Sequence, residues 1–166
     1  MRKFTIRHPI NCSPERFWEI FLDRNFNETL FRDDLRFPAF DIVEQTETDD
    51  EIVRIVRGQP NMNMPKAVMK ILGEGFGYEE TGRLDRKTER WSWTMTPNKQ
   101  ADKLHNTGRL WVEPAGEGKC TRVVEMESGA TLFGVGGLIE KTAEAELRSG
   151  WDRSAVFMNK WIADKG

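Results

Sequence analysis

The 166-residue chain is poor in the side chains that most often carry chemistry, since it has two cysteines, two histidines and one tyrosine. Cys12 and Cys120 are too few for a disulfide framework and lack the spacing of metal ligands. His8 and His105 are far apart, and no His-x-x-x-His or Cys-x-x-Cys pattern supports a metal site. The signatures that flank serine and cysteine nucleophiles are missing too. The sequence therefore predicts no metal, no cofactor and no recognisable catalytic residue.

Long apolar runs and a strong excess of one charge are also missing. No run approaches the roughly 20 apolar residues of a membrane span. The formal net charge of −2 gives no electrostatic reason to expect nucleic acid as a partner. The N-terminus has basic residues but neither the apolar core nor the cleavage site of a secretory signal. We therefore expect a cytoplasmic protein without stable membrane insertion, whose oligomeric state the sequence leaves open.

Large aromatic rings are abundant, with six tryptophans and ten phenylalanines. Because each such ring buries a large apolar surface, they concentrate the driving force for folding in a few positions. A chain of this length most simply forms one domain, residues 1–166, around one core.

The hydrophobic pattern predicts a strand, two short helices, a run of strands and one long helix. Residues 3–10 alternate as a half-buried strand, and Ser13 and Pro14 mark the start of a helix. A second short helix is expected over 26–35, and a methionine-rich loop with a short helix over 60–73. Turn residues separate strand-like segments at 38–48, 51–59, 76–85, 88–96, 106–114 and 119–130, a pattern typical of an antiparallel meander.

The glycine-rich segment 134–137 leads into a helix expected over 135–164. Apolar and small residues recur there with a period near 3.6, so one face of this helix must be buried against the sheet. No Lys-Ser/Thr pair follows Gly137, which argues against a phosphate-binding loop. The glycines instead favour a sharp turn and a close approach of the helix start to the sheet.

Two segments resemble the START-like helix-grip (SRPBCC) superfamily. "FTIRHPINCSPERFWEIFLD" is similar to its opening strand and Ser-Pro-Glu helix, and "GVGGLIEKTAEAEL" is similar to the entry into its last helix. The group includes START lipid-transfer domains, birch-pollen-allergen-like proteins and polyketide cyclase/dehydrase-like proteins. The resemblance implies an α+β helix-grip fold. In that fold a curved, seven-stranded antiparallel sheet grips the C-terminal helix on its concave face, two short helices follow the first strand, and a cavity lies between sheet and helix.

Alternation along the strands and the period of the last helix select the residues expected to line that cavity. For each of them ordinary core packing is the alternative, and the pair Trp91 and Trp93 could either fill the cavity or form its wall. The candidates are Phe40, Ile42, Ile55, Phe76, Tyr78, Trp91, Trp93, Met95, Leu110, Val112, Val124, Met126, Leu138, Thr142, Leu147, Trp151 and Met158.

Three functions are compatible with this expectation. The first is a binding or carrier protein for a hydrophobic small molecule or lipid held in the cavity. The second is a cofactor-free enzyme of the cyclase/dehydratase type, which would need a strand charge that points inward. The third is a co-chaperone-like interaction domain with an exposed apolar patch over a filled interior. The strand charges considered for the second function are Glu44, Glu79, Glu125, Glu127, Arg57, Arg83 and Arg109.

Overall fold

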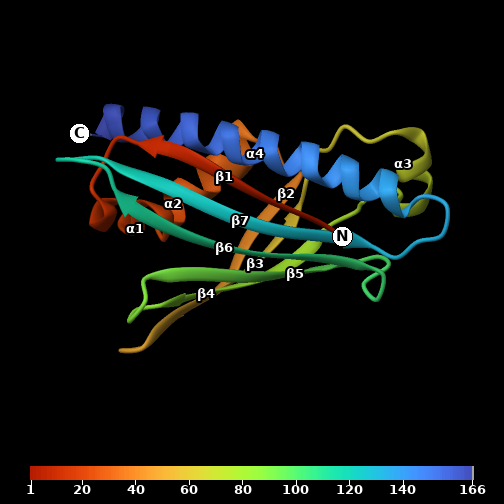
Figure 1. Ribbon diagram of the computed structural model, residues 1–166, viewed down its shortest axis with the longest axis horizontal. Helices are drawn as coiled ribbons and strands as arrows, with labels where there is room; N and C mark the ends of the chain where they lie inside the picture. Colours follow the sequence, from red (N-terminus) through yellow and green to blue (C-terminus); the bar gives the residue numbers. More distant parts are fainter. Residues whose placement is uncertain (166) are drawn as a thin grey trace.

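A computed structural model of the chain describes residues 1–165. Seven antiparallel strands form one curved sheet in the order β1-β7-β6-β5-β4-β3-β2, so β1 is an edge strand that pairs with the last strand, β7, and β2 forms the opposite edge. The long helix α4 runs along the sheet against β1 and β7 (Figure 1). The strands are β1 (Arg2–Ile10), β2 (Ala39–Glu47), β3 (Glu51–Gln59), β4 (Tyr78–Asp85), β5 (Arg90–Pro97), β6 (Leu104–Pro114) and β7 (Cys120–Ala130), and the helices are α1 (Pro14–Phe21), α2 (Arg24–Glu28), η1 (Thr29–Asp34), α3 (Lys66–Leu72) and α4 (Gly136–Lys165). The α+β helix-grip architecture predicted from the sequence is confirmed.

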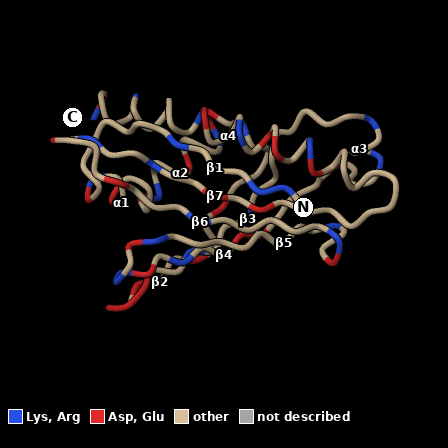
Figure 2. The backbone as a smooth tube through the Cα atoms, viewed as in Figure 1, with Lys and Arg blue, Asp and Glu red and all other residues tan. Residues whose placement is uncertain are grey.

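The strands bury one face and expose the other. On β1 the buried residues are Phe4, Ile6, His8 and Ile10, which alternate with exposed ones as the period of two requires. The opposite face of the sheet is charged, and Figure 2 shows acidic and basic residues spread along the strands. A one-residue slip would move the whole apolar set to this charged face, so the pattern fixes the register.

The first helix begins where its sequence signals place it. The Ser13 hydroxyl accepts a hydrogen bond from the Arg16 amide at 3.2 Å, and Pro14 is the first helical residue. The aromatic face of α1 is buried in the main core, including Phe17 and Phe21. The second predicted helix is divided, because α2 ends at Glu28 and the chain continues as the π-helix η1.

The last helix begins with a close contact to the preceding strand. A side-chain carbon added at Gly136 would lie 2.5 Å from the backbone oxygen of Ala130, which is closer than carbon and oxygen atoms can approach. The same addition at Gly137 would meet nothing within 4 Å. Gly136 therefore lets α4 start against β7, as the glycine pattern predicted, whereas Gly137 has no such role. Within residues 1–165 no helix combines the length and apolar character needed to cross a bilayer.

Candidate functional site

A cavity of about 280 Å³ lies between the concave face of the sheet, α4, the α2–η1 segment and the loop before α3. Pro60, Asn61 and Met62 of that loop border it, so the methionine-rich insertion 60–73 forms part of the wall. Val68 and Leu72 of α3 complete this part of the wall and pack with the start of α4. Most of the lining side chains are apolar or aromatic, as in sites for small organic molecules.

Ten of the residues proposed from the sequence as cavity residues border this cavity. They come from the loop between α3 and β4, from the strands β4, β5 and β7, and from one face of α4. They are Phe76, Tyr78, Trp91, Trp93, Met95, Met126, Thr142, Leu147, Trp151 and Met158.

The other seven lie elsewhere, and each has a packing reason. Phe40 and Ile42 form a separate cluster beneath η1, where Phe40 stacks on Phe31 with ring centroids 4.2 Å apart. Ile55 is half-buried on the outer face of β3, since the buried residues of that strand are the even-numbered ones. The remaining four are Leu110, Val112 and Val124, which pack in or against the main core, and Leu138, which is exposed on α4.

The indole rings of Trp91 and Trp93 on β5 pack against the sheet and also form part of the cavity wall. The Trp91 ring lies over Gly82 of β4 and the Trp93 ring over Gly108 of β6, so closely that a side chain at either glycine would collide with the ring. The Trp93 ring also packs at 5.7 Å from that of Trp151 on α4. The indoles are 2% and 6% exposed and still border the cavity. They therefore make a flat apolar wall and leave space beside it.

Three polar side chains and one methionine form a row across the concave face at one register position. Glu80 of β4 pairs with Met95, Met95 pairs with Asn106, and Asn106 pairs with Ser128 of β7. All four border the cavity, and Tyr78 lies two residues before Glu80 on the same face. Among residues 1–165 the side chains of Glu80, Asn106 and Ser128 make no hydrogen bond, and their polar atoms are accessible from the cavity, so they are free to bind a ligand.

Glu80 and Arg54 are the opposite charges that face this cavity from β4 and β3. Burial raises the pKa of Glu80 to about 7, and the nearby Arg54 guanidinium limits the rise. Glu80 retains some accessible surface, but that surface faces the cavity rather than bulk water, so loss of hydration dominates. Burial also lowers the pKa of Arg54 to about 10, which leaves its guanidinium charged at neutral pH.

A second buried arginine, Arg122, connects Trp151 of the cavity wall to His8 and, through His8, to the more exposed Asp152. The Nη2 atom of Arg122 donates to the Trp151 carbonyl at 2.8 Å and to Nδ1 of His8 at 3.1 Å. Because Nδ1 of His8 accepts, its Nε2 carries the proton and donates to Asp152 at 2.7 Å. Burial is the main cause that lowers the pKa of His8. Both ring nitrogens of His8 are therefore hydrogen-bonded within the fold, which is typical of a structural histidine.

The charges singled out in the sequence are not the ones that face the cavity. Arg57 and Glu79 form an ion pair at 3.0 Å on the outer face, and Arg109 and Glu125 one at 4.0 Å. The charged strand residues that border the cavity are Arg54, Glu80 and Arg122 instead, and α4 adds Glu146 and Arg153. The alternation of buried and exposed residues along the strand could have indicated an inward charge. Arg54 lies between Ile52 and Val56 on the buried side of β3.

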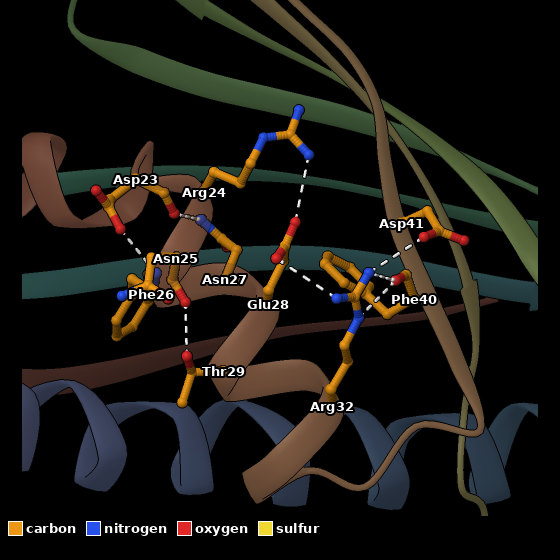
Figure 3. Close-up of polar contacts among 10 residues, drawn as sticks. All are labelled: Asp23, Arg24, Asn25, Phe26, Asn27, Glu28, Thr29, Arg32, Phe40 and Asp41. Atoms are coloured by element: carbon orange, nitrogen blue, oxygen red, sulfur yellow. Dashed lines mark hydrogen bonds and ion pairs between the residues drawn. The ribbon is translucent and has the colours of Figure 1, made fainter.

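The α2–η1 wall of the cavity is fixed to the sheet by a network of polar contacts (Figure 3). The Arg32 guanidinium donates to the Phe40 carbonyl of β2 at 2.8 and 3.0 Å and to Asp41 at 3.1 Å. Glu28 accepts from Arg24 and Arg32 at 3.3 and 3.4 Å. π-Helical turns are rare and often lie at functional sites. Here η1 directs its apolar residues, among them Leu30 and Phe31, toward the cavity.

Solved structures similar to this chain define its fold. The Zhui aromatase/cyclase from Streptomyces sp. R1128 matches with a TM-score of 0.66 and 13% identity, over 96% of this chain and 92% of that one. Norcoclaurine synthase from Thalictrum flavum, in complex with dopamine and hydroxybenzaldehyde, matches with a TM-score of 0.67 and 13% identity, over 99% and 88%. A START superfamily protein from Mycobacterium smegmatis matches with a TM-score of 0.60 and 12% identity, over 99% of both chains. The fold is therefore the START-like (SRPBCC) helix-grip fold.

The family is shown by sequence. The family model described as "Protein of unknown function (DUF2505)" matches residues 5–162, nearly the whole chain, and the chain belongs to this family. No curated protein matches the chain.

Proposed function

We propose that this protein binds a compact, ring-containing hydrophobic molecule in the cavity between the sheet and α4. The observation that carries the proposal is the cavity itself, which has aromatic walls and a row of polar groups with free hydrogen-bonding atoms. Polar side chains that face an apolar cavity and have no protein partner are the kind of group that orients a bound small molecule. The combination of apolar walls and a few convergent polar groups is typical of small-molecule sites.

The size of the cavity favours a molecule of about two rings. An engineered apolar cavity of roughly 150 Å³ accepts benzene. The cavity of about 280 Å³ is nearly twice as large, so a bicyclic compound fits and a two-chain lipid does not. The similar norcoclaurine synthase complex holds dopamine and hydroxybenzaldehyde, two small aromatic compounds with one ring each. Burial of about 250 Å² of apolar ligand surface would give about 6 kcal/mol before the cost of immobilisation, which limits the dissociation constant to tens of micromolar at the tightest.

Tryptophan fluorescence tests this proposal, because Trp93 would touch the ligand. We expect naphthalene to change the emission of the parent protein, with a dissociation constant of tens of micromolar or weaker, and to have a smaller effect on Trp93→Ala. Trp111→Ala is the matched control, since Trp111 is on the outer face of β6 and stacks with Arg90 at 4.2 Å. A parent protein that binds neither naphthalene nor any member of a panel of fatty acids, sterols and flavonoids would refute the proposal.

A second candidate is an acid–base enzyme acting on the bound molecule, as in the cyclase/dehydratase alternative. The observation that favours it is Glu80, a cavity carboxyl whose pKa of about 7 suits a general acid or base at neutral pH. In this hypothesis Glu80 takes a proton from carbon next to a ligand carbonyl, and Arg54 donates to the enolate oxygen. Exchange of the α-protons of 2-tetralone in deuterium oxide, followed by NMR, would be accelerated by the parent and not by Glu80→Gln. Equal exchange rates for the two proteins would exclude this role of Glu80.

The interaction-domain alternative receives less support. It requires a filled interior, and the cavity leaves the interior of residues 1–165 partly open.

A further inference from the structure

Arg54 and Glu80 carry opposite charges on neighbouring strands and face one cavity, yet they do not form an ion pair within residues 1–165. In the register of β3 and β4, Arg54 is opposite Gly82 and Glu80 is opposite Val56. The two residues are thus diagonal neighbours on one face, a separation that long side chains can span. A buried charge without a directly paired partner is costly, so this separation needs a cause.

The cause is the end of α1. The Nη1 atom of Arg54 donates to the carbonyl of Phe21 at 2.9 Å, and Phe21 is the last residue of that helix. The negative end of the helix dipole attracts the guanidinium. The guanidinium also lies over the rings of Phe21 and Trp91, at 4.9 and 5.0 Å from their centroids. Arg54 is therefore held toward α1, and the part of the chain that the structure describes offers Glu80 no hydrogen-bond donor.

We propose that a ligand hydroxyl group occupies the space between these two side chains, with its oxygen accepting from Arg54 and its hydrogen donated to Glu80. A hydroxyl is the smallest group that accepts and donates through one atom, so it satisfies both charges at once. The inference rests on the proposed function and names the ligand class as compact ring-containing alcohols or phenols. The rings then lie along Met95 and Trp93, the β5 neighbours of Glu80 and Gly82 in the sheet.

Three ligands with the same rings separate this inference from the proposed function. Naphthalene has no polar group, 2-methoxynaphthalene can only accept, and 2-naphthol can accept and donate. Titrations by calorimetry at about pH 8.5 keep Glu80 ionised. We expect all three to bind, with 2-naphthol about tenfold or more tighter than 2-methoxynaphthalene, the ratio for one hydrogen bond to a charged group. Equal affinities would overturn the inference and leave the proposed function intact, whereas failure of all three to bind would overturn both.

A double variant attributes the preference to this pair of residues. Arg54→Met with Glu80→Met removes both buried charges together, which avoids leaving one uncompensated. The matched control is Arg57→Met with Glu79→Met, which removes an ion pair from the outer face of the same two strands. We expect the first double variant to bind the three ligands with equal affinity and the control to keep the preference for 2-naphthol. If the Arg54→Met, Glu80→Met variant still prefers 2-naphthol, another group binds the hydroxyl and the inference is overturned. If that variant does not fold, the titration of the parent protein with the three ligands decides.

Discussion

Replacing Glu80 by glutamine should stabilise the protein by an amount that grows with pH. Glutamine resembles the neutral carboxyl, so the variant avoids the cost of ionising a group in the cavity. The pKa of Glu80 rises from 4.5 to about 7 on folding, and each unit corresponds to about 1.4 kcal/mol. Because the folded-state pKa is the higher one, the neutral carboxyl adds stability below pH 4.5, and this contribution is lost as the pH rises through about 7. The variant's advantage should be about 1 kcal/mol at pH 5 and about 3 kcal/mol at pH 8.5.

Urea unfolding at these two pH values measures the difference. Glu79→Gln is the control, because Glu79 is the adjacent residue on the outer face and pairs with Arg57 at 3.0 Å in contact with solvent. Removing an exposed ion pair should change the free energy of unfolding by less than about 1 kcal/mol at either pH. A Glu80→Gln advantage that is the same at both pH values would refute the claim that Glu80 is a desolvated cavity carboxyl.

Four further variants test the packing around the site. Gly136→Ala should destabilise the protein by more than about 1 kcal/mol in thermal or urea unfolding, because its side chain would collide with the β7 backbone, whereas Gly137→Ala should stabilise by about 0.5 kcal/mol; equal effects would contradict the account of the helix start. Gly108→Ala should push the Trp93 ring into the cavity, which would weaken naphthalene binding and shift tryptophan emission; unchanged binding would show that the ring has room to move elsewhere. Arg122→Met should cost about 3 kcal/mol, since it removes a charged donor from two buried acceptors, and a cost below about 1 kcal/mol would show that the contact with His8 adds little.

The architecture could be predicted from the sequence because its signals are local. The alternation of Phe4, Ile6, His8 and Ile10, the Ser13-Pro14 helix start and the unbroken helical period after residue 135 each depend on nearby residues alone. The π-helix η1 had no such signal, because its hydrogen bonds depend on how Phe31 and Leu30 pack against the sheet and cavity.

The polar part of the site was missed for a different physical reason. Alternation assigns residues to a face, but most strand charges lie outside, so Arg54, Glu80 and Arg122 were assigned to no inward role. Strict parity on β3 and β4 would have placed Arg54 and Glu80 inward. What no pattern could supply is the carbonyl of Phe21 that holds Arg54, since that contact joins residues 33 positions apart.

A crystal structure with 2-bromonaphthalene bound tests the central claim most directly, because anomalous scattering locates the bromine atom independently of the protein. We expect the bromine inside the cavity, with the rings against Trp93 and between the sheet and α4. A fully formed cavity without bromine, or bromine found only on the outer surface, would contradict the claim that this cavity binds compact ring-containing molecules.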